Sequence, residues 1–275
     1  MNTFTAHDGL ELPVLGFGTY KLKGYEGADA VAGAISKGYT LLDSAFNYEN
    51  EGSVAEGVRR SGAARSEIIN TSKLPGRHQA YDDATITIEE SLLRTGFEYM
   101  DLYLIHWPNP RVGKFVEAWQ AMIEAKDRGL IRHIGVCNFL PEHLERLKEE
   151  TGVLPEVNQI ELHPYFPQVE QVAYDHAHGI ITEAWSPLRR GELLSDPVIT
   201  EIAAKHGATT GQVVLAWHIA RDILAIPKAF SPARQLENLG ALELQLDPAE
   251  VEAITALGRP DGRMRDQDPA VYEEF

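Results

Sequence analysis

Four side chains capable of proton chemistry stand at or just beyond the ends of short apolar runs: Asp43, Tyr48, Lys73 and His106. A phenol has an ordinary pKa of about 10. It can act as a general acid when a fixed cation stabilises the phenolate that it leaves behind. Lys73 can be that cation, and Asp43 can keep Lys73 protonated in a partly buried site. His106 can polarise an oxygen beside the phenol.

This combination suits the delivery of a proton to a carbonyl oxygen. None of the four side chains is placed as a nucleophile, and none can donate a hydride. The residues therefore predict an oxidoreductase in which a bound cofactor carries the hydride.

The elements that must position these residues are short apolar runs that alternate with helical patterns. The strand-like runs cover residues 14–18, 40–43, 67–73, 101–106, 131–138, 156–161, 179–186 and 223–228, and helices are expected at 28–38, 51–62, 81–95, 114–129, 141–150, 169–179, 197–206, 210–220, 231–239 and 248–258. Apolar runs joined by crossover helices indicate parallel strands that are covered by helices. Eight such units in this length predict a (β/α)8 TIM barrel, with residues 1–275 as one domain.

Two further features refine this fold. The stretch G-F-G-T-Y-K at 16–21 lacks the third glycine of a dinucleotide-binding turn, which disfavours the competing doubly wound sheet. An H-D-G turn at 7–9 predicts a short N-terminal β-hairpin, expected to cap the bottom of the barrel.

Polar residues recur where the predicted strands end. They are Asp43, Lys73, His106, Asn138, Gln159, Trp185 with Ser186, and Lys228. The opposite ends show no comparable set. Because barrel active sites are built at the carboxyl ends of the strands, the four candidate catalytic residues are expected on one rim.

Composition excludes several classes of function. The chain has 25 Lys and Arg against 41 Asp and Glu, a formal charge of −16, which opposes binding to nucleic acid or to anionic membranes. It contains no apolar run of 18 residues and no signal-peptide pattern at its start. The single cysteine, Cys137, precludes an intramolecular disulfide and fits a reducing compartment. A cytoplasmic protein is expected.

Simpler interpretations compete for each residue in isolation. Asp43 can be a helix cap, Lys73 a solvated charge, His106 a turn residue and Tyr48 a packing residue; their joint placement on one rim argues against this. His176 and His178 in H-A-H precede a strand start and are interpreted as structural, so no metal site is predicted. Glu161 and Glu183 can make a glycosidase pair only if both face one open cleft.

The ordered motifs resemble the aldo-keto reductase superfamily, and within it the bacterial 2,5-diketogluconate reductase-like enzymes. They are L-P-V-L-G-F-G-T-Y at 12–20, D-S-A-x-x-Y at 43–48, D-L-Y-L-I-H-W-P at 101–108, I-G-V-C-N-F at 134–139, N-Q-I-E-L-H-P at 158–164, A-W-S-P-L at 184–188 and I-P-K-A-F-S-P-A-R-Q-L-E-N at 226–238. The resemblance implies the same barrel and a catalytic set of Asp43, Tyr48, Lys73 and His106. It also implies NADPH, bound extended without a Rossmann domain.

The resemblance assigns cofactor contacts by position. Asn138 and Gln159 are expected at the nicotinamide carboxamide, Trp185 stacked on the ring, and Ser186 and Leu188 at the pyrophosphate. Lys228 and Arg234 are expected at the adenosine 2′-phosphate, with Glu237 and Asn238 at the adenine. Ala229 replaces a usual serine beside Lys228, so NADH is possible but less favoured. Cys137 replaces a common serine, and Glu49 a common glycine.

These observations predict the NADPH-dependent reduction of small aldehydes, ketones or keto sugars, with Tyr48 as the general acid. The substrate pocket is expected to include Tyr20, Phe46, Trp107 and the C-terminal tail. The alternative is a nucleotide-binding barrel that serves as a redox sensor or regulatory subunit with vestigial catalysis. The expected partner is a small carbonyl compound, and the expected state is a monomer, by family habit.

Overall fold

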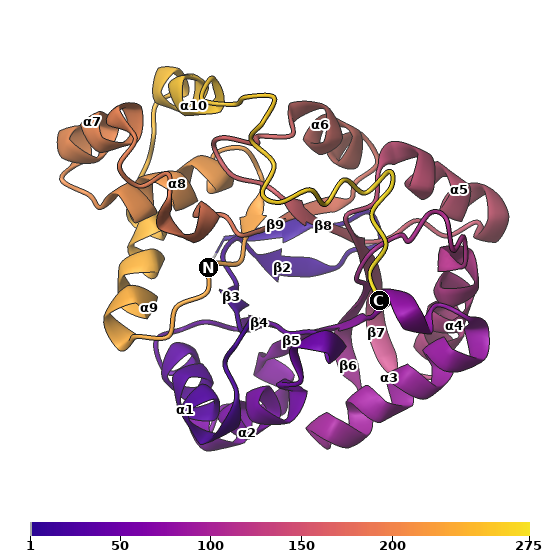
Figure 1. Cartoon of the computed structure of the whole chain (residues 1–275). Helices are drawn as coiled ribbons and strands as arrows, with labels where there is room; N and C mark the ends of the chain where they lie inside the picture. The colour runs from indigo at the N-terminus through magenta and orange to yellow at the C-terminus, as the bar shows by residue number, and fades with distance from the viewer. Residues whose placement is uncertain (1) are drawn as a thin grey trace.

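The computed structural model describes residues 2–275 and shows a ring of parallel strands enclosed by helices (Figure 1). The eight strands lie in sequence order around the ring. They are β3 (Phe17–Gly18), β4 (Leu41–Asp43), β5 (Ile69–Leu74), β6 (Met100–Ile105), β7 (Ile131–Cys137), β8 (Val157–Glu161), β9 (Ile181–Trp185) and β10 (Leu224–Ala225).

The first and last strands close the ring. Leu15 forms a parallel bridge with Ala225, and Gly18 forms one with Lys228. These contacts confirm the predicted (β/α)8 barrel. Both strands are shorter than predicted, because they meet only through these isolated bridges and because Pro227 has no N–H to donate to a ladder.

Helices alternate with the strands as predicted and cover the outside of the ring (Figure 1). They are α1 (Gly24–Ile35), α2 (Glu51–Ser61), α3 (Tyr81–Thr95), α4 (Phe115–Asp127), α5 (Pro141–Thr151), α6 (Val169–Ala177), α7 (Pro197–His206), α8 (Thr210–Ile219), α9 (Pro232–Leu239) and α10 (Pro248–Thr255). Their ends follow local chemistry. For example, Asp196 caps α7 ahead of a first-turn proline, and Gly207 ends it in the left-handed conformation.

The predicted hairpin is present and plugs the bottom of the barrel. Strands β1 (Thr3–Thr5) and β2 (Glu11–Pro13) pair antiparallel. Leu12 is fully buried, in one apolar cluster with Leu102 and Leu104 from β6. Burial of these side chains fastens the hairpin to the strands above it.

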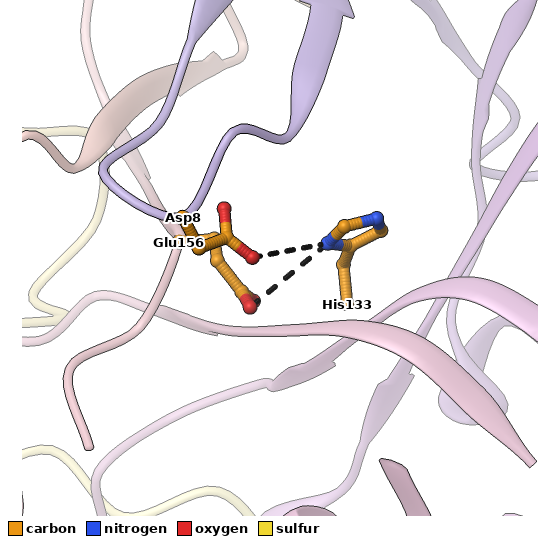
Figure 2. A group of neighbouring side chains, drawn as sticks. All are labelled: Asp8, His133 and Glu156. Carbon is orange, nitrogen blue, oxygen red and sulfur yellow. Dashed lines mark ion pairs between the residues drawn. The ribbon is translucent and has the colours of Figure 1, made fainter. Parts of the chain in front are cut away.

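A charged cluster also braces the hairpin, contrary to the expectation that the lower strand ends carry no polar set. Asp8 Oδ2 of the hairpin turn lies 3.4 Å from Nδ1 of His133 (Figure 2). The same oxygen lies 3.6 Å from Nζ of Lys126. The Lys126 ammonium also contacts Glu156, which is buried. This ammonium offsets part of the negative charge of the two carboxylates, so the cluster is explained as a structural brace between the turn, β7 and the start of β8.

No helix among the described residues combines the length and the hydropathy that a membrane crossing requires.

Candidate active site

A cavity of about 910 Å³ lies at the carboxyl ends of the strands, a volume within the range of small-molecule sites. Asp43, Tyr48 and His106 line it. Every residue predicted to contact the cofactor also lines it, namely Asn138, Gln159, Trp185, Ser186, Leu188, Lys228, Arg234, Glu237 and Asn238. The tertiary structure therefore brings three of the four candidate catalytic residues and all the predicted cofactor-binding residues to one cavity.

Lys73 lies behind the cavity wall, fully buried on β5. Its Nζ is 2.5 Å from Oδ1 of Asp43 and donates a 2.7 Å hydrogen bond to the carbonyl oxygen of Ser44. Burial alone would lower the pKa of this ammonium, but Asp43 and Tyr48 outweigh burial and raise the pKa above its ordinary value. Lys73 is therefore a fixed cation at neutral pH.

Tyr48 ends a short 3-10 turn, η1 (Phe46–Tyr48), directly beyond β4. The Lys73 Nζ lies 5.0 Å from the centroid of its ring. Burial raises the pKa of the phenol, and Lys73 acts in the opposite direction. The phenol consequently keeps its proton at neutral pH, beside a cation that can stabilise the phenolate formed when the proton leaves.

His106 follows β6 and faces the phenol. The ring centroids of Tyr48 and His106 are 5.9 Å apart, at an angle of 74°. The Nδ1 of His106 is buried, 2.8 Å from Oε1 of Glu274. The ring therefore presents its Nε2 side to the cavity, where that nitrogen can meet an oxygen held near Tyr48.

A buried carboxyl that the sequence analysis did not place in the site orients Gln159. The amide Nε2 of Gln159 donates to Oδ1 of Asp43 at 2.8 Å and to Oε1 of Glu183 at 3.1 Å. Because Asp43 and Glu183 bind both amide hydrogens, the amide oxygen of Gln159 is available to accept a hydrogen bond from a molecule in the cavity. Burial, followed by the charge of Asp43, raises the pKa of Glu183 to about 8, so this carboxyl is neutral near pH 7.

Asn138 and Trp185 support each other at the cavity wall. The indole Nε1 of Trp185 donates to Oδ1 of Asn138 at 2.8 Å, and Nδ2 of Asn138 donates to the carbonyl oxygen of His106 at 3.0 Å. The Asn138 amide keeps one N–H and one oxygen lone pair for further hydrogen bonds. Asn138 therefore ties the Trp185 ring to the backbone of the candidate catalytic histidine, a role that its position in the sequence did not reveal.

The far end of the cavity carries the cations predicted for a phosphate. Lys228 and Arg234 line it. One guanidinium nitrogen of Arg234, Nη1, contacts both carboxylate oxygens of Glu237, at 2.7 and 2.8 Å. Such a solvent-exposed pair is worth little, so a phosphate can exchange for the carboxylate. An elongated site with an amide acceptor and an indole at one end and cations at the other fits an extended dinucleotide.

One of the predicted substrate-pocket residues lies outside the cavity. Tyr20 and Trp107 line the cavity as expected, but Phe46 does not. Its ring packs under the guanidinium of Arg94, 3.7 Å from the centroid, and is turned away from the site. The side chain is buried because η1 reverses direction within three residues and sends Phe46 outward while Tyr48 faces in.

The geometry supports neither the glycosidase pair nor a metal site at the H-A-H motif. Glu161 and Glu183 are both buried, and neither lines this cavity, so they do not form a cleft pair. His176 and His178 point to different partners, the carbonyl oxygens of Asp222 and Tyr174 respectively.

Within the tail, the structure also adds Glu274, the penultimate residue of the sequence. No periodicity marks the tail sequence, and only the fold shows that this carboxylate reaches the site. Tyr272, whose ring centroid is 4.5 Å from that of Trp107, lines the cavity with it.

Comparison with known proteins agrees with this geometry. The aldo/keto reductase family profile matches residues 14–259. The chain is 48% identical to 2,5-diketo-D-gluconic acid reductase B of Corynebacterium sp. (strain SHS752001), over 99% of this chain and 98% of that protein. It is 39% identical to glyoxal reductase of Bacillus subtilis (strain 168), over 94% of each chain.

Solved structures agree as well. A mutant of Gox0644 in complex with NADPH superposes with a TM-score of 0.94 at 41% identity, covering 99% of this chain and 98% of that one. An aldo-keto reductase from Bombyx mori in complex with NADP superposes with a TM-score of 0.90 at 30% identity, covering 99% and 98%. The chain is an NAD(P)H-dependent oxidoreductase, and it belongs to the aldo/keto reductase family.

Proposed function

We propose that this protein reduces small aldehydes, ketones or keto sugars with NADPH, and that Tyr48 is the general acid. The proposal rests on the order in which four side chains contact one another. The Asp43 carboxylate holds the Lys73 ammonium, the ammonium lies beside the Tyr48 ring, and His106 lies across from that ring.

The roles of the side chains follow from this order. Tyr48 holds a proton on its Oη and releases it to a carbonyl oxygen. Lys73 stabilises the resulting phenolate, and Asp43 keeps Lys73 charged. His106 donates a hydrogen bond to the same carbonyl oxygen and thereby orients the substrate.

A reduced nicotinamide bound in this cavity supplies the hydride. Gln159 and Asn138 would hold its carboxamide, and Trp185 would pack on its ring. Lys228 and Arg234 would hold a 2′-phosphate, and this pair of cations supports NADPH over NADH. We also propose that the protein acts as a cytoplasmic monomer, a reading that its net charge of −16 and single buried cysteine support.

The test is the loss of NADPH absorbance over many turnovers with a panel of small carbonyl compounds, for the wild type and for Tyr48→Phe. Tyr48 lines the cavity, and its hydroxyl belongs to none of the side-chain hydrogen bonds described above, so its removal should leave the fold and NADPH binding intact. Turnover should fall about 10²–10⁴-fold, the usual contribution of a general acid.

Two results would overturn the proposal. Near-normal turnover of Tyr48→Phe would show that another group is the acid. Binding of NADPH by the wild type without turnover on any compound would favour the sensor alternative.

A further inference from the structure

The C-terminal tail is held across the mouth of the cavity by a set of specific contacts. In Figure 1 the yellow tail leaves α10 and runs over the ring of strands to the C-terminus. The backbone of Glu274 makes a reciprocal pair with the side chain of Asn109, whose Nδ2 donates to its carbonyl oxygen at 2.8 Å and whose Oδ1 accepts from its N–H at 2.9 Å. One residue earlier, the carboxylate of Glu273 accepts the N–H of Arg111.

The pair with Asn109 places the Glu274 carboxylate beside the candidate catalytic histidine. Its Oε2 accepts the N–H of Gly76 at 2.8 Å, and its Oε1 accepts Nδ2 of Asn47 at 2.9 Å. The same Oε1 lies 2.8 Å from Nδ1 of His106. The approach depends on Gly76, because a Cβ there would lie 2.4 Å from Nδ2 of Asn109 and 2.6 Å from the carbonyl oxygen of Glu274.

The carboxylate is ionised in this position. Burial alone would raise the pKa of Glu274, but His106, the N–H of Gly76 and the amide of Asn47 together lower it below its ordinary value. The contact with His106 is a close electrostatic contact rather than an aligned hydrogen bond, since Nδ1 has no partner along its N–H direction, and it is an ion pair only when the ring is protonated.

Among residues 2–275, no other charged group makes a comparable ion-pair contact with the His106 ring. The charged or titratable groups nearby are Tyr48 of η1, Asp43 and Lys73 behind it on β4 and β5, Cys137 of β7, and Arg77 of η3 (Gly76–His78). Asp43 and Lys73 offset each other. Burial raises the pKa of the Cys137 thiol, which keeps it neutral. Arg77 donates to Asn47 and so supports the amide that holds Glu274.

A carboxylate 2.8 Å from a ring nitrogen decides where the imidazole keeps its hydrogen. A neutral imidazole carries one hydrogen, on Nδ1 or on Nε2. The form with its hydrogen on Nε2 would leave a lone pair on Nδ1, and this partly negative nitrogen would lie 2.8 Å from the negatively charged Glu274 oxygen, which is repulsive. Neutral His106 must then carry its hydrogen on Nδ1, and its bare Nε2 can only accept a hydrogen bond.

We propose that Glu274 is a positioning residue that fixes this hydrogen on Nδ1 and thereby makes the protonated ring the only form of His106 able to donate to a carbonyl. The inference rests on the proposed function of the site and deepens it. Reduction of a carbonyl then requires the imidazolium, whose Nε2–H faces the cavity. Oxidation of an alcohol passes through the same transition state in reverse, so the Tyr48 phenolate takes the hydroxyl hydrogen while the Nε2–H of His106 holds the same oxygen.

The first test reads the tautomer directly and needs no catalysis. The ¹⁵N resonances of the histidine rings are recorded against pH for the wild type, Glu274→Gln and Glu273→Gln, and His106→Gln identifies the signals of His106. Once the ring is neutral, the wild type and Glu273→Gln should show Nδ1 protonated. Glu274→Gln can donate its amide hydrogen to Nδ1 and should shift the population toward the Nε2–H form. An Nε2–H ring in the wild type, or no change in Glu274→Gln, would overturn the inference.

The second test is the pH profile of kcat. In the wild type, kcat for reduction should be at least tenfold lower on the alkaline side than on the acidic side, because neutral His106 has no Nε2–H to donate to the carbonyl oxygen. Glu274→Gln should retain reduction on the alkaline side, and Glu273→Gln, which changes a neighbouring tail carboxylate, should follow the wild type. Identical profiles for all three proteins would refute the role of Glu274. Absence of any turnover in the wild type would refute the proposed function and leave the tautomer result to stand by itself.

Discussion

Replacing Lys73 by Met should separate the structural and the catalytic role of the buried ion pair. The apolar side chain of similar length fills the same space but removes the charge 2.5 Å from Asp43. The carboxylate, only 3% exposed, would then be compensated mainly by the amide of Gln159. Removing one partner of a buried pair costs about 3–5 kcal/mol. At about 2–4 °C per kcal/mol for a chain of this size class, the melting temperature should fall on the order of 10 °C.

The effect on turnover has a separate origin. Lys73 Nζ lies 5.0 Å from the centroid of the Tyr48 ring. Two unit charges at that distance interact by about 3 kcal/mol at an effective dielectric constant of about 20. Loss of this stabilisation of the phenolate corresponds to a rate reduction on the order of 10²-fold.

The assay combines calorimetric melting with NADPH turnover at a temperature well below the lowered melting point. Lys205→Met is the matched control, since this lysine also pairs with carboxylates but its side chain is 60% exposed, and exposed pairs contribute at most about 1 kcal/mol. Asp43→Asn added to Lys73→Met should recover part of the stability, because it removes the uncompensated charge, without recovering turnover. A Lys73→Met protein that melts within 2 °C of the control and turns over normally would refute the reasoning.

Two further predictions concern the cofactor and the buried carboxyl. Lys228→Met should raise the KM for NADPH about 10–100-fold, the loss of one charge-assisted phosphate contact, and leave the KM for NADH nearly unchanged; equal effects on both would reject a phosphate role. For Glu183, the pKa of about 8 in the folded chain against an ordinary 4.5 means that between these pH values only the folded chain holds the proton. Stability should therefore fall as pH rises through this window, by at most about 1.4 kcal/mol per pH unit from this residue. Urea unfolding at pH 5, 6.5 and 8 should show a flatter dependence for Glu183→Gln, and parallel curves for the two proteins would contradict the burial argument.

Local sequence patterns determined the elements of this protein and the residue types at the ends of its strands. The alternation of apolar runs and helical patterns predicted the barrel, because each element is specified by its own hydrophobic period and its own caps. Asp43, Lys73 and His106 were found in the same way, since a strand end is a local feature and parallel strands place their carboxyl ends together.

Only the tertiary structure decided how side chains from distant segments combine. Phe46 and Tyr48 are two residues apart, yet the turn between them buries one ring outside the cavity and points the other into it. Glu183 became part of the site because Gln159 lies beside it on the neighbouring strand. Glu274 reaches His106 across a separation of 168 positions, a contact held by Asn109 and permitted by Gly76. Such contacts depend on long-range packing that no local pattern encodes, because the tail has no hydrophobic period and gains its order only from the surface on which it lies.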